Sequence, residues 1–101
     1  IGSLKRFPAL PAVPTIDESG LKGYEATTWF GLMAPVKTPH EIVTRLNAEV
    51  ARIQASAEVR DRFINEGIEP IGGSPEQFGA FIRDEIDKYA KVVKAANLRA
   101  E

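Results

Sequence analysis

The chain of 101 residues has no cysteine and one histidine, His40. Disulfides and thiolate metal sites are therefore excluded. A lone histidine also provides neither a zinc ligand set nor a Ser–His or Cys–His pair for nucleophilic catalysis. Lys and Arg total 13 and Asp and Glu total 14, so the net charge does not favour nucleic acid or an anionic membrane as a partner. These absences predict a protein that is not an enzyme, with no metal, no cofactor and no nucleic-acid partner.

Long hydrophobic runs are also missing. The longest, WFGLMAPV (Trp29–Val36), falls well short of the roughly 20 apolar residues that a membrane-spanning helix needs. Hydrophobic residues make up 44% of the chain and charged residues 27%, which is typical of a globular domain. The length is enough for one ordinary domain and too short for two.

Three four-residue segments share the pattern of a helix capping box, a hydroxyl residue followed three positions later by Glu or Gln. They are TIDE (Thr15–Glu18), TPHE (Thr38–Glu41) and SPEQ (Ser74–Gln77). In such a box the hydroxyl accepts from the third helical N–H, and the Glu or Gln side chain reaches back to the cap. Proline, which is favoured at the first helical position, follows the hydroxyl residue in the last two. We expect long helices at these prolines and a short helix at the first box.

Apolar residues recur at helical spacing after the second and third boxes. The first of these helices is expected to start at Pro39, a short second helix to run from Ser56 to about Gly67, and the last to run from Pro75 to about Ala96. The positions predicted to be buried are Ile42, Val43, Leu46, Val50 and Ile53 in the first helix and Phe78, Ile82, Ile86, Tyr89 and Val93 in the last.

Two further segments are predicted to be β-strands. YEATTWFGLMAP (Tyr24–Pro35) is typical of a strand buried on both faces, and Gly31 in its middle indicates a bulge or a close backbone approach. IEPIGG (Ile68–Gly73) is a short strand that Pro70 confines to an edge or to the end of a sheet. Strands alternating with helices predict an α/β architecture. Because two strands cannot cover two long amphipathic helices, we expect an incomplete sheet that belongs to a larger fold.

The stretch FPALPAVPTIDESG (Phe7–Gly20) places Pro8, Pro11 and Pro14 three residues apart. A polyproline II helix has three residues per turn, so this spacing fits a ligand for an SH3 or WW groove. It also fits a rigid structural connector. The capping box at the end of the stretch favours the connector, and a stand-alone interaction module that uses PALPAVP remains the alternative function.

Binding of a carboxylate is the chemistry that the remaining polar residues favour. Helix N-termini and strand ends present N–H groups and hydroxyls to an anion, and Thr15, Thr27, Thr28 and Trp29 occupy such positions. These four are the candidate substrate-binding residues. Each also has a structural interpretation, since Thr15 fits a helix cap, the other two threonines fit a strand and Trp29 fits a core anchor.

Four stretches follow one another along the chain: PALPAVPTIDESG, LKGYEATTWFGLMAP, TPHEIVTRLNAEV and GIEPIGGSPEQFGAFIRDEIDKYAKVVKAAN. In this order they resemble the C-terminal part of Bug-type receptors, the extracytoplasmic solute-binding proteins of tripartite tricarboxylate transporters. The resemblance covers essentially the whole chain, and Lys22 stands where the family commonly has proline. The matching positions include Pro8, Pro11, Thr15, Glu18, Gly20, Trp29, Gly31, Pro35, Asn47, Gly67, Pro70, Pro75 and Phe78.

The resemblance implies the C-terminal portion of an α/β, type II periplasmic-binding-protein-like fold, a Venus flytrap of two domains around a cleft. Residues 1–24 would end domain two with the proline-rich connector and the short helix. Residues 25–35 would form a crossover strand. Residues 36–101 would form the C-terminal part of domain one.

The same resemblance implies a function. Such receptors capture a small carboxylate-bearing solute, such as a di- or tricarboxylate, an amino acid or an aromatic acid, and deliver it to the permease subunits of a membrane transporter. It also implies a periplasmic location after export, with the signal peptide outside these residues. Because the partner strands would lie elsewhere, copies of this chain on its own are expected to self-associate.

Overall fold

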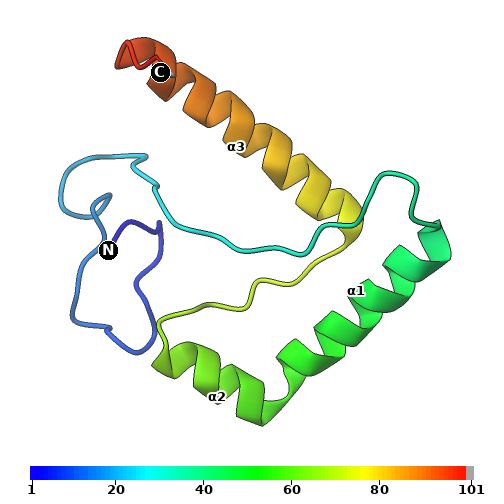
Figure 1. Cartoon of the computed structure of the whole chain (residues 1–101). Helices are drawn as coiled ribbons and strands as arrows, with labels where there is room; N and C mark the ends of the chain where they lie inside the picture. The colour runs from blue at the N-terminus through cyan, green and yellow to red at the C-terminus, as the bar shows by residue number, and fades with distance from the viewer. Residues whose placement is uncertain (100–101) are drawn as a thin grey trace.

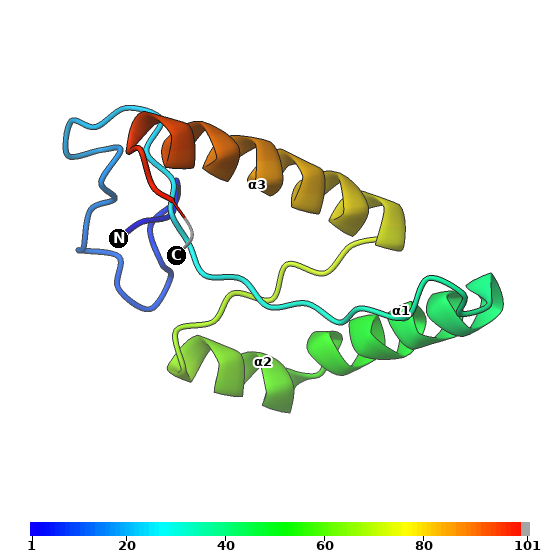
Figure 2. The same ribbon diagram turned by 45° about the horizontal axis from the view of Figure 1, so that its top comes forward.

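The computed structural model describes residues 1–99, which form three helices: α1 (His40–Ala55), α2 (Ala57–Asn65) and α3 (Pro75–Ala95). Helices α1 and α2 lie on one side of the molecule and α3 on the other, and the extended segments 24–36 and 68–74 run between them (Figures 1 and 2). The N-terminal residues form a loop at the end of the molecule where α3 finishes. None of the helices in this described part is both long and apolar enough to span a membrane.

Helix α3 begins and ends close to where the sequence predicts. The Gln77 N–H donates to Ser74 Oγ at 3.2 Å, and the Ser74 N–H donates to Gln77 Oε1 at 2.8 Å, so the SPEQ capping box is complete. Pro75 is the first helical residue, as predicted. Helix α2 also lies near its predicted bounds and is followed by Gly67 with a φ of +76°. Glycine ends a helix readily because this left-handed conformation costs it little.

Helix α1 starts one residue later than predicted, and its capping box does not form. Pro39 is the cap residue, with a ψ of 138°, and no side chain caps the helix. Thr38 lies one position too early, and its N–H donates to Pro35 O at 2.9 Å in a turn. The prediction of a TPHE capping box is therefore wrong, because proline takes the position from which a hydroxyl caps a helix.

The first box, at Thr15, makes its hydrogen bonds without starting a helix. The Thr15 N–H donates to Glu18 Oε2 at 2.9 Å, and the Glu18 N–H donates to Thr15 Oγ1 at 3.0 Å. Residues 16–20 make a turn, in which Gly20 has a φ of +118°. The predicted short helix is therefore wrong, since a positive φ leaves the helical region and stops the chain after one turn.

The proline-rich stretch folds into turns. The Leu10 N–H donates to Phe7 O at 2.9 Å, and the Val13 N–H donates to Leu10 O at 3.0 Å. A polyproline II helix has no internal hydrogen bonds, so these two consecutive turns contradict that conformation. The observed geometry favours the structural connector over a ligand for an SH3 or WW groove.

The two predicted strands are extended, but neither pairs into a sheet within residues 1–99. In that part of the chain, no backbone hydrogen bond involves residues 27–34 or 69–72. The predicted incomplete sheet is thus reduced to two unpaired extended segments. Strands need partners for their N–H and C=O groups, and these segments find none in each other.

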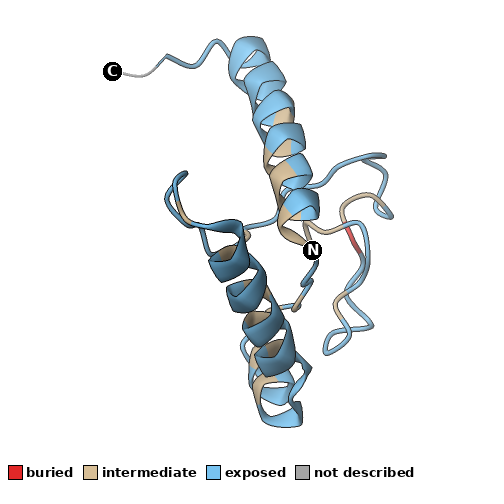
Figure 3. Ribbon diagram, turned by 90° about the vertical axis from the view of Figure 1, so that its right-hand side faces the viewer, coloured by how far each residue is buried: buried red, intermediate tan, exposed pale blue. Residues whose placement is uncertain are grey.

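Apolar side chains gather on the helices without being buried. Thr15, with 1% of its surface exposed, is the one buried residue of the described part, and the helices are half-buried or exposed throughout (Figure 3). Leu46 is 54% exposed and Ile86 is 62% exposed. Burial of these helix faces is therefore incomplete within residues 1–99: Trp29 packs on Phe78 and Phe81, but no residue of the faces is fully buried, as expected if two strands cannot cover the helices.

One side-chain hydrogen bond connects α1 to the segment that leads into α3. Asn47 Nδ2 donates to Gly73 O at 2.9 Å. The segment turns at Gly72 and Gly73, whose φ values are +67° and +116°. Glycine adopts such values without strain, so the GG pair is a turn and helix entry.

Candidate functional site

Thr15, the first predicted site residue, is occupied by the capping box. Its hydroxyl accepts from the Glu18 N–H, and its carbonyl accepts from both the N–H and the hydroxyl of Ser19, at 3.1 and 2.8 Å. The side chain is buried, which matches its structural interpretation as a cap. Among the described residues, no hydrogen bond joins Thr15 to Thr27 or Thr28, so the predicted site residues form two separate groups.

Glu18 is the centre of a polar network that closes the N-terminal loop. Arg6 Nε donates to both carboxylate oxygens of Glu18, at 2.8 and 3.1 Å, and Arg6 Nη1 donates to Pro11 O at 2.9 Å. The Thr15 N–H and then the Arg6 guanidinium lower the pKa of Glu18. The TIDE pattern identified Glu18, but nothing in the sequence pointed to Arg6 as its partner.

Asp17 holds the next turn of the chain. Its carboxylate accepts from the Gly23 N–H at 2.7 Å and from Lys22 Nζ at 3.1 Å. The Gly23 N–H and then the Lys22 ammonium lower the pKa of Asp17. The sequence analysis missed this contact, although Asp is a common partner for backbone N–H groups in turns. Asp17 and Glu18 together fix the path by which the chain enters the segment 24–36.

Thr27 and Thr28 lie on that extended segment with their side chains exposed. Just before them, the Ala26 N–H donates to Gly2 O at 2.9 Å, which ties the segment to the N-terminus. Just after them, Trp29 packs on α3. The two hydroxyls are thus accessible, and the backbone on both sides of them is held.

Trp29 is half-buried in an aromatic cluster. Its ring meets Phe78 edge to face at a centroid distance of 5.7 Å and Phe81 at 5.3 Å. The two phenylalanines stack on each other at 6.4 Å. This placement supports the interpretation of Trp29 as an anchor.

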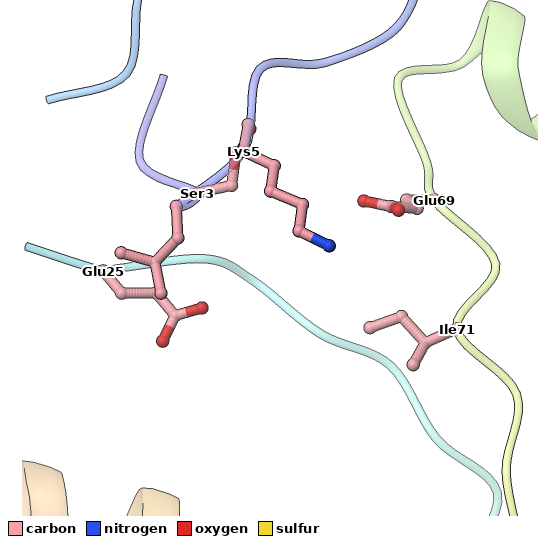
Figure 4. A pocket seen from close by; sticks show the side chains of 6 residues that line it. Ser3, Lys5, Glu25, Glu69 and Ile71 are labelled. Carbon is pink, nitrogen blue, oxygen red and sulfur yellow. Dashed lines mark hydrogen bonds between the residues drawn. The ribbon is translucent and has the colours of Figure 1, made fainter. Parts of the chain in front are cut away.

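An open hollow of about 260 Å³ lies where three segments meet (Figure 4). Lys5 enters from the N-terminal segment, Glu25 from the segment 24–36, and Glu69 and Ile71 from the segment 68–74. Lys5 is a suitable partner for a carboxylate, whereas Glu25 and Glu69 repel one. The sequence analysis selected none of these residues, because they meet only in the fold.

A second hollow, of about 340 Å³, lies on the other side of Glu25, between the segment 23–26 and the last turns of α3. Its cation, Lys88, is paired with Glu85 and lies 5.4 Å from the centroid of the Tyr89 ring. The hydrogen bond to Glu85 raises the pKa of Lys88. Lys88 is therefore already engaged and is a weaker candidate than Lys5 for holding an anion.

Neither hollow has the ligand set of a metal site. Within residues 1–99 no group of three or more His, Cys, Asp or Glu side chains is placed to hold a metal ion. The described residues offer the exposed hydroxyls of Thr27 and Thr28, which line neither hollow, and the ammonium group of Lys5 in the first hollow. These are groups that hydrogen-bond or attract an anion.

Comparison with known proteins places the chain among transport receptors. Residues 1–98 match the model of the tripartite tricarboxylate transporter family receptor. A UPF0065 protein encoded between tcbD and tcbE in Pseudomonas sp. is 40% identical over 99% of this chain and 30% of its own length. The protein BugT of Bordetella pertussis is 37% identical over 91% of this chain and 28% of its own length.

A solved structure is also similar. The R. palustris protein Rpa4515 with adipate is 42% identical and superposes with a TM-score of 0.83, over 95% of this chain and 32% of its own length. The chain thus spans about a third of the length of the proteins that it matches. From the match over residues 1–98, the chain belongs to the tripartite tricarboxylate transporter receptor family.

Proposed function

We propose that this chain is part of an extracytoplasmic receptor that captures a small carboxylate-bearing solute in the periplasm and delivers it to the permease subunits of a membrane transporter. The observation that carries this proposal is the likeness to the R. palustris protein with adipate, a dicarboxylate, at 42% identity and a TM-score of 0.83. Membership of a receptor family supports it and gives no support to an enzymatic role.

Within such a receptor, the chain contributes one wall of the solute site. Thr27 and Thr28 supply hydroxyls to a carboxylate, and Lys5, in the hollow between the three segments, supplies a positive charge. Support comes from the exposure of Thr27, Thr28 and Lys5. Hydrogen bonds to a charged group are worth about 1.5–3 kcal/mol, so two hydroxyls make a substantial share of a site.

The experiment that tests this function uses a chimaeric receptor in which residues 1–99 replace the matching third of the R. palustris protein. Calorimetric titration with adipate, with other di- and tricarboxylates and with amino acids should give saturable binding of at least one carboxylate. The unmodified R. palustris protein is the control. A folded chimaera that gives no heat with any member of the panel, while the control binds adipate, contradicts the proposal.

We also propose that the isolated chain self-associates. It exposes 8649 Å², whereas a folded monomer of 11.1 kDa exposes about 5,700 Å². The surplus exceeds what a typical protein interface covers on each partner, about 800 Å². Together with the unpaired extended segments, it supports self-association of the isolated chain. Light scattering over a wide concentration range should show a rising mass, and a constant monomer mass contradicts it.

A further inference from the structure

We infer that Trp29 is a positioning residue that does not touch the solute, and that it holds Thr27 and Thr28 in a fixed place. The inference rests on the proposed function, since it assigns roles within the same site. The supporting observations are two contacts that lie on either side of the two threonines, one between aromatic side chains and one between backbone groups.

The first contact is the aromatic clasp formed by Trp29, Phe78 and Phe81. The plane of the Trp29 ring is inclined at 84° and 81° to the rings of Phe78 and Phe81, with both centroids within 6 Å. Edge-to-face pairs of this kind attract beyond their buried area. Two such pairs hold one indole ring from two positions of α3 that lie three residues apart, on the same face of the helix.

Gly31 fixes the register of the extended segment on the clasp. A Cβ atom at this position would lie 2.3 Å from Cζ and 2.8 Å from Cε1 of Phe78, so any larger residue would force the Phe78 ring to move. Residues two apart in an extended chain share a face, and Trp29 and Gly31 therefore both meet α3. A shift of one residue would bring Phe30, which is 85% exposed, against α3 instead.

The second contact lies at the other end of the pair of threonines. The Ala26 N–H donates to Gly2 O at 2.9 Å. A Cβ atom on Gly2 would lie 2.3 Å from Ala26 O, so this approach also requires glycine. Thr27 and Thr28 are therefore the residues between two glycine-dependent contacts.

This arrangement suits solute binding because it orders the backbone before the solute arrives. A segment that is already held loses less conformational freedom on binding, which raises affinity without any new contact. Trp29, with its ring occupied by Phe78 and Phe81, acts on the solute through the backbone of the residues before it.

The test measures adipate affinity in the chimaeric receptor by calorimetry. Gly31→Ala should weaken binding about tenfold, and adding Phe78→Leu should recover only part of the loss, because leucine relieves the clash with the new methyl group but removes one ring of the clasp. Gly79→Ala is the matched control, since its Cβ would lie 3.6 Å from Arg83 Nη1, an ordinary contact, and should leave the affinity unchanged.

Two further variants separate positioning from direct contact. Trp29→Phe, which keeps an aromatic ring in the clasp, should bind within about threefold of the parent, and Phe81→Ala should weaken binding about fivefold. The opposite pattern, a large loss from Trp29→Phe with no loss from Phe81→Ala, would mean that Trp29 contacts the solute and would overturn the inference. So would an unchanged affinity in Gly31→Ala.

If the chimaera binds no solute, tryptophan fluorescence of this chain still tests whether the aromatic clasp forms. Trp29 is the single tryptophan of the 101 residues, so its emission in this chain reports on the clasp alone. Gly31→Ala and Phe78→Ala should each shift the emission to longer wavelength and increase quenching by acrylamide, and Gly79→Ala should do neither. Emission that is identical in all these variants would show that the clasp is not formed.

Discussion

The N-terminal loop, residues 1–24, and the three helices are stabilised in opposite ways. The loop contains no helix, yet it holds the one buried side chain of the described residues, Thr15, and a connected set of hydrogen bonds around Glu18 and Asp17. The helices have regular backbone hydrogen bonds and many apolar side chains, but none of their residues is buried.

The difference shows which interactions a third of a receptor can satisfy by itself. Hydrogen bonds among residues 1–24 need no other part of the protein, and the loop is built mainly from these. Apolar faces are stabilised only when something covers them, and the relatives have about two thirds of their length outside the matched region. We therefore expect changes in the loop to act locally and changes on the helices to depend on the covering partner.

The largest expected effect of a single substitution within this comparison is at Thr15. Thr15→Val keeps the shape but removes the hydroxyl that accepts from the Glu18 N–H, so local opening of the loop should become easier by about 1–3 kcal/mol. Amide exchange at residues 16–20 measures this free energy. Thr27→Val is the control, because Thr27 is exposed, and should change exchange there by less than about 0.5 kcal/mol. Equal effects of the two variants would show that the loop does not depend on the capping box.

The next largest effect is expected at the start of α3, and the start of α1 serves as its comparison. Ser74→Ala removes a cap that is formed and should destabilise the first turn of α3 by about 1 kcal/mol. Thr38→Ala removes a hydroxyl that makes no cap hydrogen bond and should leave α1 unchanged. Amide exchange in the first turns of the two helices checks both. A loss at α1 as large as at α3 would mean that Thr38 caps α1 in solution.

A smaller effect is expected at the hydrogen bond between α1 and the entry to α3. Asn47→Ala removes the donor to Gly73 O and should destabilise the turn at Gly72 and Gly73 by about 0.5–1 kcal/mol, since the bond is exposed. Asn65→Ala, in the last turn of α2, is the control. Amide exchange at the start of α3 should rise in the first variant only, and a rise in neither would mean that α1 and α3 are not joined at this point.

The smallest effect is a dependence on pH that is confined to the loop. The pKa values of Asp17 and Glu18 are lowered by folding, so both carboxylates stabilise the loop above their ordinary pKa of roughly 4. That contribution is lost as the pH falls through the lowered, folded-state values. Amide exchange of residues 16–24 should therefore accelerate on acidification beyond its intrinsic pH dependence. Glu18→Gln should remove part of this response, and an unchanged response would exclude Glu18 as its source.

Structural features that depend on residues close together in the chain could be predicted from the sequence. The SPEQ box, the hydrogen bonds around Thr15 and the extent of α3 follow from residues within a few positions of one another, and all are found. The TPHE box fails because proline itself takes the cap position, and the polyproline II interpretation fails because the backbone closes into turns. The strands stay unpaired for another reason, since their partners are absent from residues 1–99, and the exposed helix faces agree with the expectation that two strands cannot cover them.

The candidate site was less accessible to sequence analysis. Thr27 and Thr28 were identified from their place on a strand, and their role stays a prediction. The contacts on either side of them depend on Phe78, Phe81 and Gly2, which are remote in the chain, so no local pattern reveals them. Gly31 was the one usable signal. Glycine inside a strand indicates that another group lies close to the backbone, but it does not show which group this is.

The most direct measurement is hydrogen exchange in the 101-residue chain alone, at several low concentrations, and within the chimaeric receptor. We predict equal protection of residues 15–24 in both, and strong additional protection of the second half of α3, residues 86–95, in the chimaera. Protection of residues 86–95 in a dilute, monomeric chain that matches their protection in the chimaera would contradict the dependence of the helices on a covering partner.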